Sequence, residues 1–190
     1  MSGARTPKAL DGPPRNVNHA VVMAKEVRAV HHPDRRRDVL MPYAPALLVR
    51  RGSLVFLSGV TAAPVYHSHP HREEEFDLPA GMREQATLAM ENLKKTLAAA
   101  GCTMADVVSA TRYLTDAREQ DDLNRVWADY LGDHLPTTTT VEVSRLATHP
   151  RCKVEISAIA VADSQFRSPR RAAAARRTAP PKHKRRRSRR

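Results

Sequence analysis

Hydrophobic positions between residues 82 and 131 recur at helical spacing in two stripes. The first stripe consists of Ala86, Met90, Leu93 and Leu97. It predicts a helix over 82–100 that stops at Gly101. The second stripe consists of Leu123, Val126, Trp127, Tyr130 and Leu131. Asp116 and Glu119 are spaced as in a capping box, so we expect this second helix to begin after Asp116 and to end at Gly132.

Shorter segments rich in β-branched and aliphatic residues predict strands. They are residues 47–50, 54–58 and 107–114, and two strands within 136–162 that are joined by a polar loop over 144–151. The turn Arg51-Gly52-Ser53 predicts that the first two strands pair as a β-hairpin. Residues 21–32 are a weaker candidate for one more strand in front. This order of elements indicates an α+β fold, a single mixed sheet with two helices packed on one face.

The positive charge of the chain is concentrated at its C-terminal end. Of the 32 Lys+Arg residues 12 fall in 167–190, where there is no Asp or Glu, so residues 1–166 hold 20 basic and 20 acidic residues. We expect 163–190 to be a disordered basic tail, because it has almost no core-forming residues. Such a polycation binds nucleic acid through phosphates without reading sequence. Incidental binding and a functional role both remain open.

The remainder divides into a Pro- and Gly-rich segment over 1–20, expected to be disordered, and one folded domain over 21–162. No apolar run is long enough to cross a bilayer, so we expect no membrane partner. No apolar signal core follows Met1, and Cys102 and Cys152 give no disulfide framework. A cytoplasmic protein is therefore expected.

Three histidines alternate in the long loop over 61–80. His67, His69 and His71 are followed by three glutamates, and imidazoles at this spacing are able to hold zinc or nickel. The loop has no cysteine and no evident second shell, and Pro70 interrupts the run. We therefore predict a solvated loop, with no metal and no cofactor.

Glu155 lies between aliphatic residues in the last predicted strand. Strand alternation turns its side chain away from the face of Val154 and Ile156. Placing a carboxylate there costs folding free energy unless this face is solvated, or the carboxylate is paired or belongs to a functional site. An exposed strand face and a functional site are both open interpretations.

Seven blocks in order resemble the RidA/YjgF family of enamine/imine deaminases. They are PYAPAL, LVFLSG, ATLAMENLKKTLAAAG, VVSATRYLTD, LNRVWADYLGDHLP, VEVSRL and KVEISAIAV, within residues 41–162. The resemblance implies a chorismate-mutase-like fold and a homotrimer that associates through the sheet, with small-molecule sites between subunits.

The resemblance also assigns site residues. It makes Glu155 the catalytic residue that positions water. It implies substrate-binding roles for Tyr43, Ser58, Gly59, Asn92, Thr138, Thr140 and Arg145. The sequence departs from the family at Thr138, where a carboxylate-binding arginine is usual, and at Val60, where glutamine is common. Arg112, His149 and Arg151 are further candidate anion partners, although a surface role is the simpler interpretation of each.

Three functions follow as hypotheses. The first is a RidA-like hydrolase acting on a reactive enamine, imine or related small metabolite, with specificity altered at Thr138. The second is a trimer of this fold that has lost catalysis and binds or senses a small ligand. The third is nucleic-acid association through 167–190, including the endoribonuclease activity ascribed to some members of the family.

Overall fold

The computed structural model describes residues 24–31, 33 and 43–163 of the chain. The segments predicted to be disordered, 1–20 and 163–190, lie outside these ranges apart from Asp163. The strands are β1 Glu26–Val30, β2 Ala46–Arg51, β3 Ser53–Val60, β4 Val107–Leu114, β5 Thr137–Glu142 and β6 Val154–Ala162. The helices are α1 Met82–Ala99 and α2 Gln120–Leu131, with single 3₁₀ turns at Glu73–Glu75, Met104–Asp106 and Ala117–Glu119.

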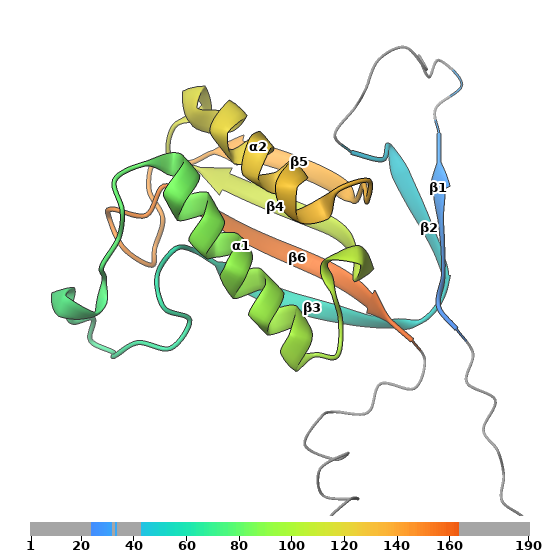
Figure 1. The fold of residues 1–190 in the computed structure, drawn as a ribbon, viewed down its shortest axis with the longest axis horizontal. Helices are drawn as coiled ribbons and strands as arrows, with labels where there is room; N and C mark the ends of the chain where they lie inside the picture. Colours follow the sequence, from blue (N-terminus) through green and yellow to red (C-terminus); the bar gives the residue numbers. More distant parts are fainter. Residues whose placement is uncertain (1–23, 32, 34–42, 164–190) are drawn as a thin grey trace, which may run out of the picture.

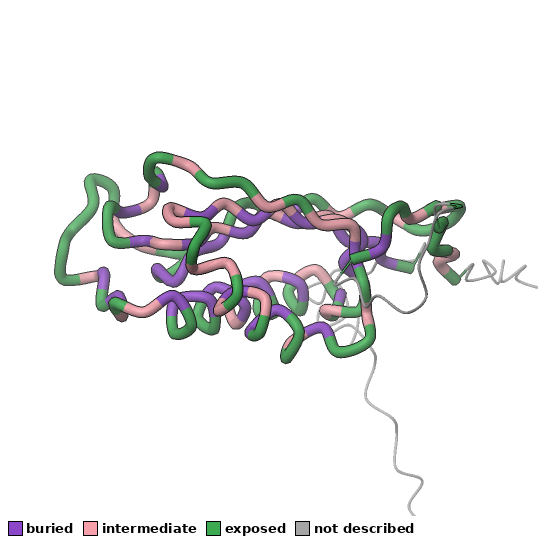
Figure 2. Tube along the Cα trace, turned by 90° about the horizontal axis from the view of Figure 1, so that it is seen from above, coloured by how far each residue is buried: buried purple, intermediate pink, exposed green. Residues whose placement is uncertain are grey.

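Two helices cover one face of a mixed four-stranded sheet, as predicted. The strand order is β3-β6-β4-β5, with β4 and β5 parallel and the other neighbours antiparallel. Both helices lie on the same side of the strands (Figures 1 and 2). In the part of the chain that the structure describes, no helix covers the opposite face, which carries exposed apolar side chains, Phe56 at 72% and Leu54 at 53% exposure.

The predicted apolar stripes form the core between the helices and the sheet. Ala86, Met90, Leu93 and Leu97 of α1 are completely buried, as is Leu123 of α2. Burying a Leu or Met side chain contributes about 1.5–3 kcal/mol, so this layer supplies much of the driving force for folding. Gly101 and Gly132 adopt positive φ at the two helix ends, which explains why the helices stop there.

The predicted capping box before α2 is only half formed. Asp116 caps the 3₁₀ turn by accepting a hydrogen bond from the backbone N–H of Arg118 at 2.9 Å. The carboxylate of Glu119 is instead held by Lys153 Nζ at 2.8 and 2.9 Å. A reciprocal capping box occurs at Thr103 and Asp106, before β4.

The predicted hairpin between residues 47–50 and 54–58 is wrong, although both strands exist. β2 pairs antiparallel with β1 in a separate two-stranded ribbon, and β3 pairs with β6 (Figure 1). At the junction Gly52 has φ +124°, and a Cβ there would lie 2.3 Å from Cγ1 of Val161. This close backbone approach turns the chain from the ribbon into the sheet, and only glycine permits it.

No helix within the described ranges is both long and apolar enough to cross a membrane. Cys102 and Cys152 are free thiols inside the protein, and burial raises the pKa of both.

Candidate functional site

A bulge in β3 brings Glu155 against a glycine. Leu57 pairs with Ala158 and Val60 with Ile156, so Ser58 and Gly59 together lie opposite a single residue of β6. A Cβ on Gly59 would lie 2.1 Å from Oε1 of Glu155 and 2.8 Å from its Cδ. Any side chain at residue 59 would therefore displace the carboxylate. Ser58, Gly59 and Glu155, which were predicted to belong to one site, are brought together on the face without helices.

Two further residues border this carboxylate. Tyr113 of β4 is the cross-strand partner of Glu155, so the two half-buried side chains lie side by side on that face. The thiol of Cys152 is 1% exposed, and the Glu155 charge adds to the effect of burial in raising the pKa of that thiol. We call Ser58, Gly59, Tyr113 and Glu155 the Glu155 cluster. Tyr113 was not predicted, although its alternation with Arg112 placed it on this face.

Tyr43 and Thr138 lie at the start of β5, away from the Glu155 cluster. The backbone N–H of Ala44 donates to the carbonyl of Pro136 at 3.3 Å, which holds exposed Tyr43 beside this end of the strand. Thr138 Oγ1 also donates to the Pro136 carbonyl, at 3.3 Å. We call Tyr43 and Thr138 the Thr138 cluster.

The sheet geometry sets the separation of the two clusters. Thr138 is level with Ala110, and Glu155 is level with Tyr113, three residues further along β4. Three residues of rise and two strand spacings give a separation of about 14 Å between the two backbones. A three-carbon imino acid is shorter than this. Within one chain, therefore, the structure does not bring Thr138 and Glu155 into one small-molecule pocket.

Thr140 faces the helices, and its hydroxyl is hydrogen-bonded to the buried side chain of Arg112. Its hydroxyl accepts from Arg112 Nε at 3.0 Å and Nη2 at 2.7 Å, while Arg112 Nη1 donates to Asn124 Oδ1 at 2.9 Å. The guanidinium lies over the ring of Trp127 at 5.2 Å, and burial lowers the pKa of Arg112 to about 10. Arg112 is 5% exposed and lies beneath α2, so it does not substitute for an anion-binding arginine on the open face.

Asn92 has a structural role in this chain. Its amide nitrogen donates to the carbonyls of Thr61 and Ala63, both at 2.9 Å. Both amide hydrogens are thereby used, and they fix the start of the long loop to α1 immediately after β3. Asn92 therefore stabilises the backbone that follows Ser58 and Gly59, and does so from the helical side of the sheet.

Of the remaining basic candidates, only Arg145 is available. His149 and Arg151 both bind the carboxylate of Glu73, at 2.9 and 2.5 Å, which lowers the pKa of Glu73. Arg145 is exposed, and none of the described carboxylates pairs with it. Its neighbour Leu146 packs in the same apolar cluster as Tyr113, at the end of the sheet where Glu155 lies. Among the candidate anion partners, Arg145 therefore remains available to a substrate anion at this end of the sheet, because the others are bound to protein groups.

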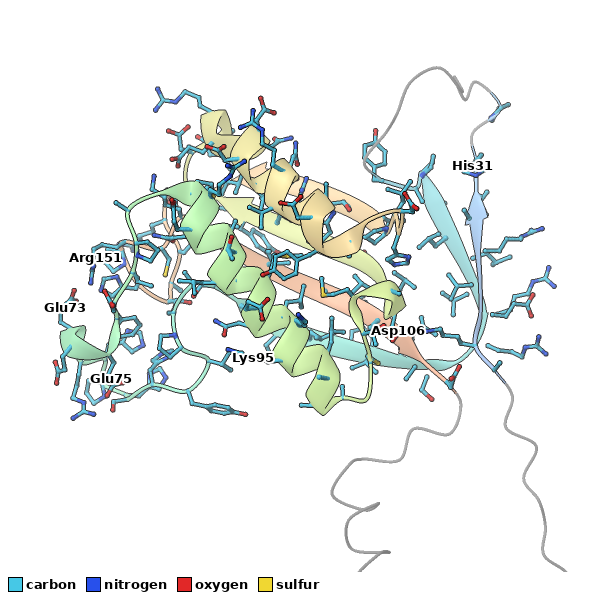
Figure 3. The ribbon with its side chains drawn as sticks, viewed as in Figure 1. His31, Glu73, Glu75, Lys95, Asp106 and Arg151 are labelled. Atoms are coloured by element: carbon cyan, nitrogen blue, oxygen red, sulfur yellow. The ribbon has the colours of Figure 1, made fainter. Side chains whose placement is uncertain are left out.

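The loop over 61–80 is better anchored than a solvated loop. Phe76 is 2% exposed and stacks on His149 with ring centroids 4.7 Å apart. Gln85 donates to the carbonyls of Pro79 and Arg151, both at 2.8 Å, and accepts from the backbone of Lys153. Figure 3 shows Glu73, Glu75 and Arg151 together at the end of the molecule away from β1.

The three histidines of this loop lie together. The possible ligand atoms of His67, His69 and His71 are all within 4.8 Å of one another. Burial and the neighbouring histidines lower the pKa of His71, against the opposing effect of Glu75. The adjacent depression of about 540 Å³ is lined by Pro64, Tyr66, His67, Ser68 and Glu75, so it lies on this loop and not at Glu155.

A mixed sheet with two helices on one face, and the Glu155 carboxylate on the other, defines the class of small α+β proteins that the sequence blocks resemble. Residues 35–162 match the family model described as Endoribonuclease L-PSP. The chain belongs to this family, which is the RidA/YjgF family.

Relatives and a solved structure agree with that assignment. Protein DfrA of Myxococcus xanthus is 36% identical over 141 residues, which cover 73% of this chain and 99% of that protein. The 2-iminobutanoate/2-iminopropanoate deaminase of Bos taurus is 30% identical over 139 residues, covering 73% and 93%. A Rid-family protein of Yersinia pestis superposes with a TM-score of 0.58 over 71% of this chain and 98% of its own. At 22% identity this last likeness supports the fold alone.

Proposed function

We propose that this protein is a RidA-like hydrolase that converts a reactive imine or enamine to a carbonyl compound and ammonia. The observation that carries the proposal is the Glu155 carboxylate, seated over Gly59 on an exposed sheet face beside Tyr113. The similarity to a bovine deaminase of 2-imino acids supports the same chemistry.

The reaction needs few groups because an imine is already activated. Glu155 accepts a proton from a bound water as the oxygen attacks the C=N carbon, and the proton passes to the nitrogen. The tetrahedral carbinolamine then loses ammonia: its hydroxyl proton is transferred to the amine nitrogen as the C–N bond breaks and the C=O bond forms. Water and imine are consumed in equal amounts, and no redox change occurs. The enzyme's contribution is to orient the water and the substrate.

We propose further that the functional unit is a homotrimer in which the site lies between subunits. The Glu155 cluster and the Thr138 cluster are about 14 Å apart in one chain, and Thr138, two residues before Thr140 and on the same face, lies on the helical side of the edge strand β5. A partner subunit whose β5 edge packs against the open sheet face can bring its Thr138 within reach of a small ligand at Glu155. The exposed Phe56 and Leu54 on that face are the side chains that association would cover.

Thr138 is proposed to change substrate choice. A bidentate arginine–carboxylate pair contributes about 1.5–3 kcal/mol, and a threonine hydroxyl supplies neither its charge nor its geometry. We therefore expect poor activity on small 2-imino acids, and better activity on a larger or less charged imine, or on one whose anion reaches Arg145. If the chain has no hydrolytic activity at all, the same pocket is proposed to bind a small ligand.

We predict that Thr138→Arg raises kcat/KM for 2-iminopropanoate by about tenfold to two-hundredfold, because it restores the charge-assisted fork. The measurement is ammonia or pyruvate release from freshly generated imine, compared with the unmodified protein. Thr139→Arg is the comparison variant, since it adds the same charge to β5 on the opposite face, which is the open face that carries Glu155. An equal gain in both variants would assign the effect to general charge attraction. High activity in the unmodified protein would show that another residue binds the carboxylate.

Nucleic-acid association is the second candidate, and the 12 basic residues without an acid in 167–190 favour it. We predict binding to RNA and DNA that lacks sequence preference, weakens steeply with salt and is lost on deleting 167–190. Fluorescence anisotropy at several salt concentrations would measure this. Binding that survives the deletion would move the nucleic-acid surface into the folded domain.

A further inference from the structure

The loop between β3 and α1 gathers three imidazoles into one group. The ring centroids of His67, His69 and His71 are 4.8–4.9 Å apart in all three pairs. Three ligands from five consecutive residues are therefore arranged as a triangle, and a single ion between them would contact all three. We call these residues the His triad.

One ligand atom is already oriented. Nδ1 of His67 lies 2.8 Å from the carbonyl oxygen of Pro64, so Nδ1 carries the proton and donates it. This leaves the Nε2 lone pair free to bind a cation. A metal-binding histidine is commonly oriented in this way, with its second nitrogen donating to a backbone carbonyl. This contact could not be predicted from the sequence, because Pro64 supplies only its backbone carbonyl.

The loop is braced around the His triad. The ring of Phe76, which is 2% exposed, lies 5.1 Å from that of His67 and 5.3 Å from that of His71. Ser68, between two of the ligands, is bound through its backbone N–H and its hydroxyl to Glu75, both at 2.6 Å. Arg72 pairs with the same carboxylate. The rings of His67 and His71 therefore pack against Phe76, and Ser68 is held to Glu75, without the use of imidazole nitrogens.

The geometry requires only a small closure to bind metal. Zinc–nitrogen bonds of about 2.0–2.1 Å in a tetrahedral site place two ligand nitrogens about 3.4 Å apart. The possible ligand atoms of the His triad lie within 4.8 Å of one another, so the widest pair must shorten by at most about 1.4 Å, which side-chain rotation in this exposed loop can provide. Three imidazoles without a thiolate suit zinc, nickel or copper and disfavour magnesium or calcium.

We propose that the His triad binds one divalent cation of the late first-row transition metals, namely Zn²⁺. The three imidazoles are its protein ligands, and one coordination position remains open to solvent. A depression of about 540 Å³, which His67 lines together with Tyr66 and Glu75, lies beside the His triad. This site is separate from the Glu155 cluster and does not depend on the proposed hydrolase function. Metal binding would link three residues of the loop that follows the β3 bulge, His67, His69 and His71.

The test is a calorimetric titration of the untagged full-length chain, first stripped with chelator, with ZnCl₂. One equivalent is expected to bind per chain. His67→Ala, His69→Ala and His71→Ala are each expected to weaken binding by about 100-fold or more, beyond what loss of a second-shell partner usually costs. Co²⁺ in place of zinc should give the intense visible bands of a low-coordinate site, and zinc should raise the Tm of the unmodified chain but not of His69→Ala.

His31→Ala is the matched control, since His31 is exposed on the β1 side of the molecule, distant from the His triad (Figure 3). It should leave affinity and stoichiometry unchanged. Absence of binding at micromolar zinc would overturn the proposal. Equal affinity in His69→Ala, or loss of the bound equivalent in His31→Ala, would also overturn it by assigning zinc to other histidines. The three alanine variants lie in a loop, and unchanged circular dichroism without metal would show that they fold.

Discussion

Replacing Glu155 with Gln is expected to lower kcat/KM for the best imine substrate by about 10²–10⁴-fold, the usual contribution of a positioned general base. Glutamine keeps the shape of the side chain over Gly59 but cannot accept a proton from water. Steady-state ammonia release with the purified full-length variant measures the effect. Because the change is nearly isosteric on a half-buried face, the thermal midpoint should stay close to that of the unmodified protein.

Glu84→Gln is a closely matched control. The Glu84 carboxylate also lies over a glycine, since a Cβ on Gly81 would be 2.1 Å from its Oε2, but Glu84 is in the first turn of α1, on the helical layer. Its replacement should leave kcat/KM unchanged. If Glu155→Gln retained activity within a few-fold, the water would have to be held by another group. If no imine were turned over even by the unmodified protein, the ligand-binding alternative would replace the hydrolase.

The helices and the central strands could be predicted from sequence because their signal is local. The apolar spacing through Met90 and Leu93 places these side chains on one face only if the segment is a helix. Gly101 and Gly132 adopt the positive φ at which the two helices end. The partner of β2 could not be predicted in this way. Alternation of apolar and polar residues indicates that a segment is a strand but does not indicate which strand it pairs with. After the turn at Gly52 the chain leaves β2, which pairs with β1, and enters β3, which pairs with β6.

The sequence could indicate candidate site residues but not how they are arranged. Gly59 and Glu155 are together because of a bulge, and the sequence marks a bulge only by a glycine in a strand. Thr138 and Glu155 are separated because the register of β5 on β4 sets their distance, and register depends on tertiary packing. Arg112 was expected at the surface, as most arginines are. It is buried because Thr140, Asn124 and the face of Trp127 together satisfy its guanidinium.

Replacing Phe56 with Glu is expected to convert the proposed trimer of three 21.1 kDa chains into monomers at micromolar concentration. Phe56 is 72% exposed on the face opposite the helices. Covering such a side chain contributes about 1.5–3 kcal/mol per subunit, and a carboxylate placed there must be desolvated without a partner. In a cyclic trimer each substitution acts at three interfaces, so the effect on assembly is multiplied. Light scattering coupled to size exclusion measures the mass directly.

Leu88→Glu is the control for this experiment, because Leu88 is also an exposed apolar residue, at 40%, but belongs to α1 on the helical layer. It should leave the mass of the trimer unchanged. Activity separates two arrangements of the site. If the Glu155 and Thr138 clusters meet only between subunits, Phe56→Glu should lose imine hydrolysis together with the trimer, although Glu155 itself is intact. A monomeric unmodified chain, or a monomeric Phe56→Glu variant with full activity, would confine the site to one chain and leave Thr138 without a role in it.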